Sequence, residues 1–365
     1  MDFHDTPAEA AFREQARNWL ATSAPAYRVP PGASLETIAR RGRDWQKCKA
    51  AAGYGALTLP KAVGGREASP AEEVIFAEEE GRFDVPVGPY ILIGTTLVAP
   101  TILAHGTPEQ QHRHVRPTLD GDETWCQLFS EPAAGSDLAG LRTRAVRDGD
   151  DWIVNGQKVW NSWAQFADHG ILLARTDADA PKHRGITAFL VPMKTPGVEV
   201  RPLRQVSGDA EFCEVFLADV RVPDTCRLGP VHGGWKVAMT MLMNERVGVG
   251  GESVALPSTS DLVARVKALG VDLAPYRQRL AQLVAREQGL RHFRARVRTK
   301  LSRGETPGVE SAMTKLVYAN LLQDLSALML DLEGTAALYP DGDPAAAQRV
   351  HHGYFWAAAL RIAGG

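Results

Sequence analysis

The spacing of apolar residues changes twice along this 365-residue chain, and these changes limit the folds it can adopt. Up to about Gly121 apolar residues recur at helical spacing, three or four residues apart. Between Thr124 and Leu228 the period falls to two and turn residues become frequent. From Gly233 onward the helical spacing returns. A helical, then extended, then helical order predicts an α+β chain of more than one domain.

The same changes predict three domains: an N-terminal helical domain (1–122), a middle β-barrel domain (123–230) and a C-terminal helical bundle (231–365). The predicted helices are 8–20, 71–82, 235–247, 276–302 and 309–332. The predicted strands are 152–154, 158–160, 171–174, 186–191, 198–203 and 214–217.

Local signals mark some of the boundaries. Ser69 precedes Pro70 as a helix cap, and Thr107 with Gln110 forms a capping box. Asn155-Gly156 lies between two short apolar runs, which predicts a tight hairpin turn there.

Composition excludes several classes of protein. A net charge of -2 makes nucleic acid an unsuitable partner. The stretch 88–104 contains Gly94 and Pro100, so it predicts a buried helix and no membrane span. The N-terminus lacks an apolar signal core, so a cytoplasmic location is expected. No metal site is predicted, because no metal-binding spacing with the histidines is found around Cys48, Cys126, Cys213 and Cys226.

The loop 129–140 carries the strongest local signal, because small residues follow a strand and serines stand at positions 130 and 136. Small side chains let main-chain N–H groups approach an anion, and hydroxyls donate to phosphate or to a ring heteroatom. The alternative is an ordinary turn.

The run Ser130-Glu131-Pro132 through Gly135-Ser136-Asp137 resembles the signature of the acyl-CoA dehydrogenase family. The resemblance implies that Ser130 contacts the ring of FAD and Ser136 its pyrophosphate, while Glu131 and Asp137 brace the loop. A second run, 156–162, resembles another family motif and implies that Trp160 packs on the flavin and Ser162 lies near its N5 atom. We call the implied set the flavin cradle: Gln127, Phe129, Ser130, Gly135, Ser136, Trp160 and Ser162.

The chain departs from the family motif at Asn161 and Trp163, and Trp163 is expected to reshape the flavin edge. Without the resemblance, Trp160 would be read as a core residue of a hairpin.

α,β-Desaturation requires a base that removes an α-proton. Glu245 lies on an apolar helical stripe, where loss of solvation raises the pKa of a carboxyl. The apolar members of this stripe are Ala238, Met241, Leu242 and Val249. The alternative is a structural salt bridge to an arginine. Glu245-Arg246 resembles the Glu-Arg pair that supplies the base in isovaleryl- and long-chain-type members.

Other family members carry the base near the C-terminus, where Gly364 stands here. Its main-chain N–H is expected to bind the thioester carbonyl. The resemblance also implies a further helix after Gly365.

Two family segments that complete the FAD site from a neighbouring subunit are not recognisable: Arg-x-x-Phe-Gly and Gln-x-x-Gly-Gly-x-Gly. Such losses resemble the heterotetrameric actinobacterial sterol side-chain dehydrogenases. A homo- or hetero-tetramer with a paralogous subunit is therefore expected, with electron-transfer flavoprotein as electron acceptor. Gly248, Gly250 and Gly251 either end the helix or make room for a bulky, sterol-derived acyl-CoA.

The expected function is FAD-dependent dehydrogenation of an acyl-CoA. One alternative is a non-catalytic or half-site subunit of a heteromeric dehydrogenase, which the incomplete FAD site favours. Another is a flavin monooxygenase, which Glu245 and the Gly-Ser-Asp loop argue against.

Overall fold

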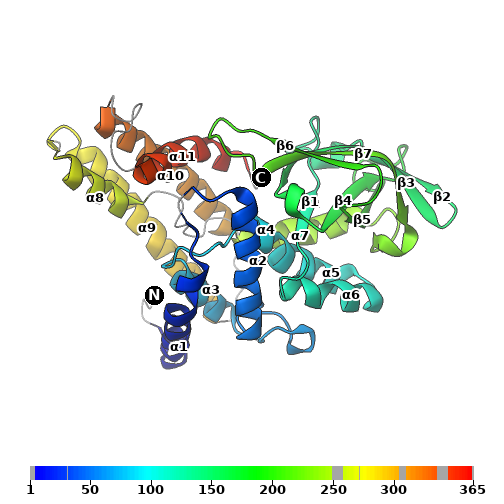
Figure 1. Ribbon diagram of the computed structural model, residues 1–365, viewed down its shortest axis with the longest axis horizontal. Coiled ribbons are helices and arrows are strands. Elements are labelled where there is room, and N and C mark those ends of the chain that lie inside the picture. The colour runs from blue at the N-terminus through cyan, green and yellow to red at the C-terminus, as the bar shows by residue number, and fades with distance from the viewer. Residues whose placement is uncertain are drawn as a thin grey trace. The chain divides into compact units, whose positions relative to one another are not determined.

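The computed structural model describes residues 5–30, 32–248, 258–270, 272–303, 310–334 and 344–363. The chain forms two compact units, each built from segments that are distant in sequence (Figure 1). Unit 1 contains Met1–Gly32, Ala68–Asp84 and Arg246–Gly365, and unit 2 contains Ala33–Glu67 and Val85–Glu245. The expected domain boundaries at 122/123 and 230/231 stay a prediction.

Unit 1 is helical in its described residues. A leucine-rich core joins three of its helices, through side chains such as Leu262, Leu290 and Leu325. The helices are α1 (Pro7–Ser23), η1 (Ala24–Tyr27), α3 (Pro70–Glu80), α8 (Thr259–Leu269), α9 (Arg277–Ser302), α10 (Glu310–Glu333) and α11 (Pro344–Leu360). The predicted helices 8–20, 71–82, 276–302 and 309–332 are confirmed to within a few residues.

An ion-pair cluster joins α1 to α3 inside unit 1. The Glu79 side chain is fully buried and accepts hydrogen bonds from Arg17 Nε at 3.0 Å and Arg13 Nη1 at 3.0 Å. Arg13 also pairs with Asp5 and Glu78. Buried carboxylates are costly unless paired, so this cluster specifies how the two helices pack.

Unit 2 combines an eight-stranded sheet with helices. The strand order is β6-β7-β3-β2-β4-β5-β8, and β1 pairs in parallel with β4. The strands are β1 (Trp125–Leu128), β2 (Arg144–Asp148), β3 (Asp151–Ser162), β4 (His169–Arg175), β5 (Ile186–Pro192), β6 (Val198–Leu203), β7 (Phe212–Pro223) and β8 (Arg227–Leu228). The helices are α2 (Leu35–Ala51), η2 (Lys61–Val63), α4 (Pro89–Leu92), the π-helix η3 (Ile93–Val98), α5 (Ala99–His105), α6 (Pro108–Leu119), η4 (Leu138–Gly140), η5 (Ala164–Phe166), η6 (Asp224–Cys226) and α7 (Gly234–Gly248), of which the part up to Glu245 belongs to unit 2.

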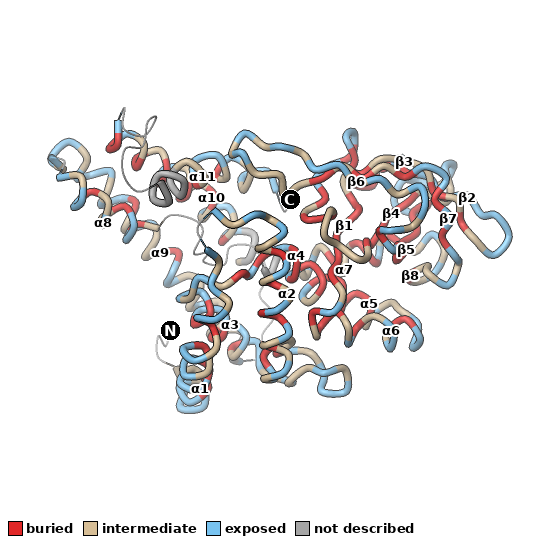
Figure 2. Tube along the Cα trace, in the orientation of Figure 1, coloured by how far each residue is buried: buried red, intermediate tan, exposed pale blue. Residues whose placement is uncertain are grey.

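The sheet has a core on each face. Residues of η3, α5, α6 and α7 pack against β1, β4 and β5 in one core, and the other core lies among the strands themselves. Figure 2 shows the buried residues concentrated in these strands and along α5 and α7. The middle β domain expected from the period-two pattern is confirmed.

The hairpin predicted at Asn155-Gly156 is wrong, because β3 runs without interruption through both residues. The chain turns instead around Gly149, between β2 and β3. Asn155 donates from Nδ2 to Asp219 Oδ1 at 3.0 Å across the β3–β7 pair, where the register shifts. A Cβ at Gly156 would lie 2.4 Å from Thr143 Oγ1, so glycine is needed for close approach and not for a turn.

The predicted caps and the buried segment before α6 are confirmed. Thr107 Oγ1 accepts from the Gln110 N–H and the Gln110 side chain accepts from the Thr107 N–H, while Ser69 caps α3 with Pro70 in its first turn. The stretch 88–104 forms α4, η3 and α5, with Val98 and Ile102 fully buried. Among the described residues no helix is both long enough and apolar enough to cross a membrane.

Candidate active site

The loop after β1 is fixed to β3 at its first residues. Phe129 is buried, and its carbonyl accepts from Lys158 Nζ at 3.0 Å. The Ser130 carbonyl accepts from the Val159 N–H at 2.9 Å. These bonds hold the half-buried Ser130 beside the middle of β3.

Glu131 braces the loop, as predicted. Its carboxylate accepts from the main-chain N–H groups of Arg142 at 2.6 Å and Thr143 at 2.9 Å, and from Lys158 Nζ at 2.8 Å. Burial alone would raise the pKa of Glu131, but the Lys158 ammonium and these hydrogen bonds lower it below its usual value. Burial lowers the pKa of Lys158 to about 8, although Glu131 opposes that shift.

The outer part of the loop presents donors to solvent. Gly135 and Ser136 are exposed, and within the described residues their main-chain N–H groups have no hydrogen-bond acceptor. No atom lies within 4 Å of a Cβ built at Gly135, so the space above the loop is open. Asp137 is held by Lys182 at 2.8 Å. This arrangement fits a phosphate, because two main-chain N–H groups without an acceptor among the described residues and a serine hydroxyl are exposed at neighbouring positions of the loop.

Trp160 is turned outward by an irregularity in the sheet. The β3–β7 register shifts between Lys158 and Asn161, and Trp160 has a positive φ of 61°. Its side chain is 60% exposed and touches Phe212 edge-on, with ring centroids 5.8 Å apart. Bulges re-aim side chains in this way, and the exposed ring offers an apolar wall to a planar ligand. The half-buried Ser162 ends the same strand.

Asn161 and Trp163 point into the protein. Asn161 Nδ2 donates to the Gln127 carbonyl at 2.7 Å, which ties β3 to β1. Trp163 is 4% exposed and stacks at a tilt on Tyr90, 4.6 Å between centroids. In the described part of the chain its Nε1–H has no acceptor. The structure therefore brings the β1 and β3 members of the flavin cradle into one connected framework.

Helix α7 begins against the sheet and carries the predicted base in its last turn. A Cβ at Gly234 would lie 2.7 Å from the Thr187 carbonyl carbon, so the helix starts in close contact with β5. Ala238 and Met241 are fully buried, Leu242 packs against the same core, and Glu245 is half-buried one turn further on. The predicted stripe is confirmed for Ala238, Met241 and Leu242, whereas its fourth member, Val249, lies outside the described residues. The role of Glu245 as base stays a prediction.

Some predicted residues lie outside the described residues, namely Gly364, Gly250 and Gly251. The described part of helix α7 runs to Gly248. Whether the glycines end the helix or make room for a bulky acyl group stays a prediction. Sequence reasoning missed Lys158 and Asn161 as inward-facing anchors of the loop. The signal for Lys158 was its place in a strand whose alternate residues, such as Val154, face inward.

The helical, sheet and helical segments match, in this order, the three domains of a class of flavoprotein oxidoreductases that act on acyl-CoA. The chain belongs to the acyl-CoA dehydrogenase family. It matches the family's N-terminal domain over residues 6–122, its middle domain over 126–220 and its C-terminal domain over 232–365.

Two similar relatives come from Mycobacterium tuberculosis. The acyl-CoA dehydrogenase IpdE1 is 38% identical over 97% of this chain and 93% of its own length. The acyl-CoA dehydrogenase FadE34 is 42% identical over 82% of this chain, which spans 41% of FadE34. Among solved structures, the Tcur3481-Tcur3483 steroid ACAD is 28% identical, with a TM-score of 0.84 and coverage of 100% of this chain and 95% of that one.

Proposed function

We propose that this chain catalyses the FAD-dependent α,β-dehydrogenation of an acyl-CoA thioester, with Glu245 as the base that removes the α-proton. The observation that carries the proposal is the flavin cradle. Its phosphate-type donors at Gly135 and Ser136 are exposed, and so is the Trp160 ring on the adjoining strand.

The chain's own residues suit FAD. Ser136 and the loop N–H groups would hold the pyrophosphate, Ser130 and Ser162 would donate to the ring system, and Trp160 would cover it. When bound, FAD accepts the β-hydride of the substrate. The Glu131–Lys158 pair keeps the loop in shape without touching the ligand.

Glu245 lies at the end of the apolar stripe of α7, one turn beyond the buried Met241. An ionised carboxylate there takes up the α-proton and becomes neutral, a change that an apolar neighbourhood favours. By family resemblance the Gly364 N–H binds the thioester carbonyl and acidifies the α-carbon. The structural salt bridge remains the alternative role of Glu245.

The test is Glu245→Gln, which keeps the shape and removes the basic oxygen. We expect normal FAD content and a ~10²–10⁴-fold slower reduction of the flavin by acyl-CoA in a stopped-flow assay. Glu245→Asp, the matched control, retains a carboxylate on a side chain one methylene shorter. Its rate of flavin reduction should lie between those of the parent and the Gln variant. Flavin bleaching by the Gln variant within a few-fold of the parent rate would place the base elsewhere.

A half-site subunit is the second candidate, favoured by the two missing FAD-site segments. The Tcur3481-Tcur3483 steroid ACAD carries two component names, which supports a paralogous partner for this chain as well. Its name also supports a bulky, steroid-derived acyl-CoA as substrate. Electron-transfer flavoprotein is the proposed reoxidant.

A further inference from the structure

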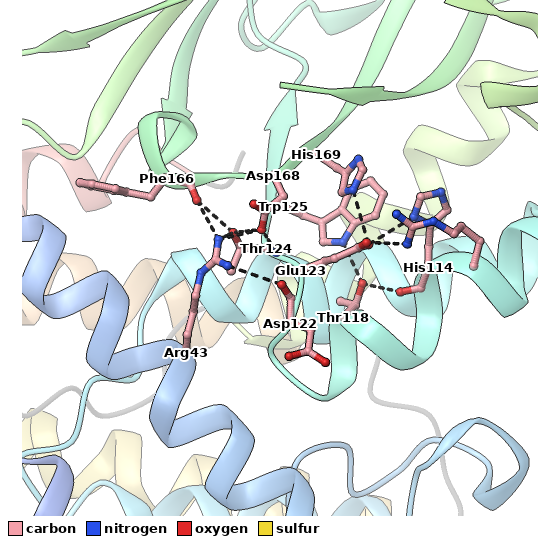
Figure 3. Close-up of polar contacts among 11 residues, drawn as sticks. Arg43, His114, Thr118, Asp122, Glu123, Thr124, Trp125, Phe166, Asp168 and His169 are labelled. Atoms are coloured by element: carbon pink, nitrogen blue, oxygen red, sulfur yellow. Dashed lines mark hydrogen bonds and ion pairs between the residues drawn. The ribbon is translucent and has the colours of Figure 1, made fainter. Parts of the chain in front are cut away.

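A cluster of two histidines and one glutamate lies at the start of β1 and β4, apart from the flavin cradle. His114 comes from α6, Glu123 from the turn before β1, and His169 is the first residue of β4 (Figure 3). Their ligand atoms, one from each side chain, all lie within 4.8 Å of one another. The proposed dehydrogenation uses none of the three.

The distances suit a shared ion better than direct hydrogen bonds. Glu123 Oε2 lies 3.4 Å from His114 Nδ1 and 3.5 Å from His169 Nε2. Good N–H···O bonds measure about 2.7–3.2 Å. Two ligands about 2.0–2.1 Å from one tetrahedral zinc ion lie about 3.3–3.4 Å apart. The third pair, within 4.8 Å, reaches that separation after a movement of at most about 1.5 Å.

The ring positions are fixed by packing. Trp125 lies against both imidazoles, with centroids 4.8 Å from His169 and 5.3 Å from His114. Its Nε1–H donates to Thr118 Oγ1 at 2.8 Å, and that hydroxyl donates to the His114 carbonyl at 2.6 Å. The three aromatic rings are therefore held together without any ion.

Hydrogen bonds through Thr124 hold the residue after Glu123 beside the start of β4. The His169 N–H donates to the Thr124 carbonyl at 3.1 Å, and the Thr124 N–H donates to Asp168 Oδ2 at 2.9 Å. Arg43 closes this side by contacting both Thr124 and Asp168 at 2.7 Å (Figure 3). Preorganised ligands of this kind lose little entropy when an ion binds.

Charge and ligand type also suit a divalent ion. Two imidazole nitrogens and one carboxylate oxygen are ligand types that zinc-like ions bind. Arg113 pairs with Glu123 Oε1, which leaves Oε2 towards the histidines. The three side chains are only 12–14% exposed, enough for water to supply a fourth ligand.

We propose that His114, Glu123 and His169 form a binding site for one divalent transition-metal ion of the zinc type, with water as fourth ligand. Such an ion joins α6, the turn before β1 and the start of β4. It thereby stabilises the base of the strand that leads into the flavin cradle.

The test uses tag-free protein that is stripped with a chelator, dialysed and kept in excess FAD. Zn²⁺ is titrated calorimetrically, and Co²⁺ is added to observe the visible absorption of a tetrahedral nitrogen–oxygen site. We expect one ion per chain and a higher thermal midpoint with Zn²⁺, because a ligand that binds only the folded state stabilises it. Absence of tetrahedral Co²⁺ absorption, or of Zn²⁺ binding, in the parent protein would overturn the proposal.

Variants separate ligation from packing. His114→Phe and His169→Phe keep an aromatic ring on Trp125 but remove the nitrogens, and each should weaken Zn²⁺ binding more than about ten-fold. The control is His112→Asn, because His112 is exposed on the same helix. This variant should bind Zn²⁺ with the affinity of the parent.

Arg113→Gln should bind Zn²⁺ more tightly than the parent, because a positive charge that competes for Glu123 is gone. This variant decides the matter if the Phe variants misfold. Equal affinity in His169→Phe and the parent, or no gain in Arg113→Gln, would contradict the site.

Discussion

At the scale of single residues, the flavin loop is held by one buried ion pair and one exposed ion pair. Glu131 and Lys158 are 6% and 0% exposed, whereas Asp137 and Lys182 are 63% and 54% exposed. Both pairs measure 2.8 Å between charged atoms. Equal distances do not imply equal contributions, because a buried charge left without its partner loses solvation that nothing replaces.

We therefore predict that Lys158→Met destabilises the protein by about 3–5 kcal/mol, since it leaves Glu131 buried and charged. Lys182→Met, the matched control that removes the exposed partner of Asp137, should change stability by only about 0–1 kcal/mol. Urea unfolding followed by circular dichroism measures both. Similar losses in the two variants would show that burial does not distinguish these pairs.

The flavin cradle gives a second prediction at this scale. Ser136→Ala should reduce retention of FAD about ten-fold or more, because a hydrogen bond to a charged group contributes about 1.5–3 kcal/mol. Ser162→Ala should leave retention nearly unchanged and shift the flavin's reduction potential. FAD absorbance after dialysis and a potentiometric titration report the two effects. Equal FAD occupancy in Ser136→Ala and the parent would remove Ser136 from the phosphate site.

At the scale of elements, the sequence predicted those helices and strands whose periodic pattern agrees with their packing. Helices 235–247 and 276–302 and strand 198–203 lie within α7, α9 and β6 almost to the residue. The hairpin at Asn155-Gly156 failed because its local signal is also compatible with a bulged strand. Pairing of β3 with β7 along both strands then outweighed the local turn preference.

The sequence predicts some of the candidate site residues, and only the structure shows the others. Glu245 and the serine loop follow from local pattern and family resemblance, so sequence alone reaches them. The cluster of His114, Glu123 and His169 cannot be predicted from the sequence. Its members lie 9 and 46 residues apart, which is not the spacing of a known metal-binding motif. The parallel pairing of Trp125 with His169 at the start of β1 and β4 brings Glu123 near His169. The contact of Trp125 with α6 adds His114.

Helix packing in unit 1 supplies a pH-dependent prediction. Burial alone would raise the pKa of Glu79, but hydrogen bonds from Arg17 and Arg13 outweigh it and lower the pKa. Because the folded pKa lies below the unfolded value of about 4.3, the stabilisation is complete above that value. It is lost as the pH falls through the folded pKa.

Glu79→Gln should therefore destabilise the protein by about 1.5–3 kcal/mol at pH 7, with the difference from the parent shrinking below about pH 4. Glu78→Gln is the control: Glu78 is its neighbour on α3, is 46% exposed and also pairs with Arg13. Glu78→Gln should lower the free energy of unfolding by no more than about 1 kcal/mol at every pH measured. Unfolding midpoints at pH 7, 5 and 3.5 measure both, and a constant difference for Glu79→Gln across this range would contradict the assignment.

At the scale of the whole molecule, the family match covers all three domains, yet the neighbour-supplied FAD segments are not recognisable. A flavin held by one chain's loop alone keeps only part of its hydrogen bonds. Since each missing bond to a phosphate lowers affinity about ten-fold or more, FAD is expected to dissociate from an isolated chain. A paralogous partner would restore the missing contacts.

We predict that protein purified alone contains well below one FAD per chain, and that co-purification with a paralogue encoded beside it restores full loading. Absorbance of the flavin relative to protein gives the ratio, and light scattering gives the assembly state.

Competition between a straight-chain and a polycyclic acyl-CoA of similar size then tests the substrate, with the polycyclic thioester expected to react preferentially. The two outcomes are independent. Full FAD loading in a homo-oligomer would reject the unlike partner, whereas preference for the straight chain would reject only the bulky substrate, because the base and the flavin cradle serve either acyl group.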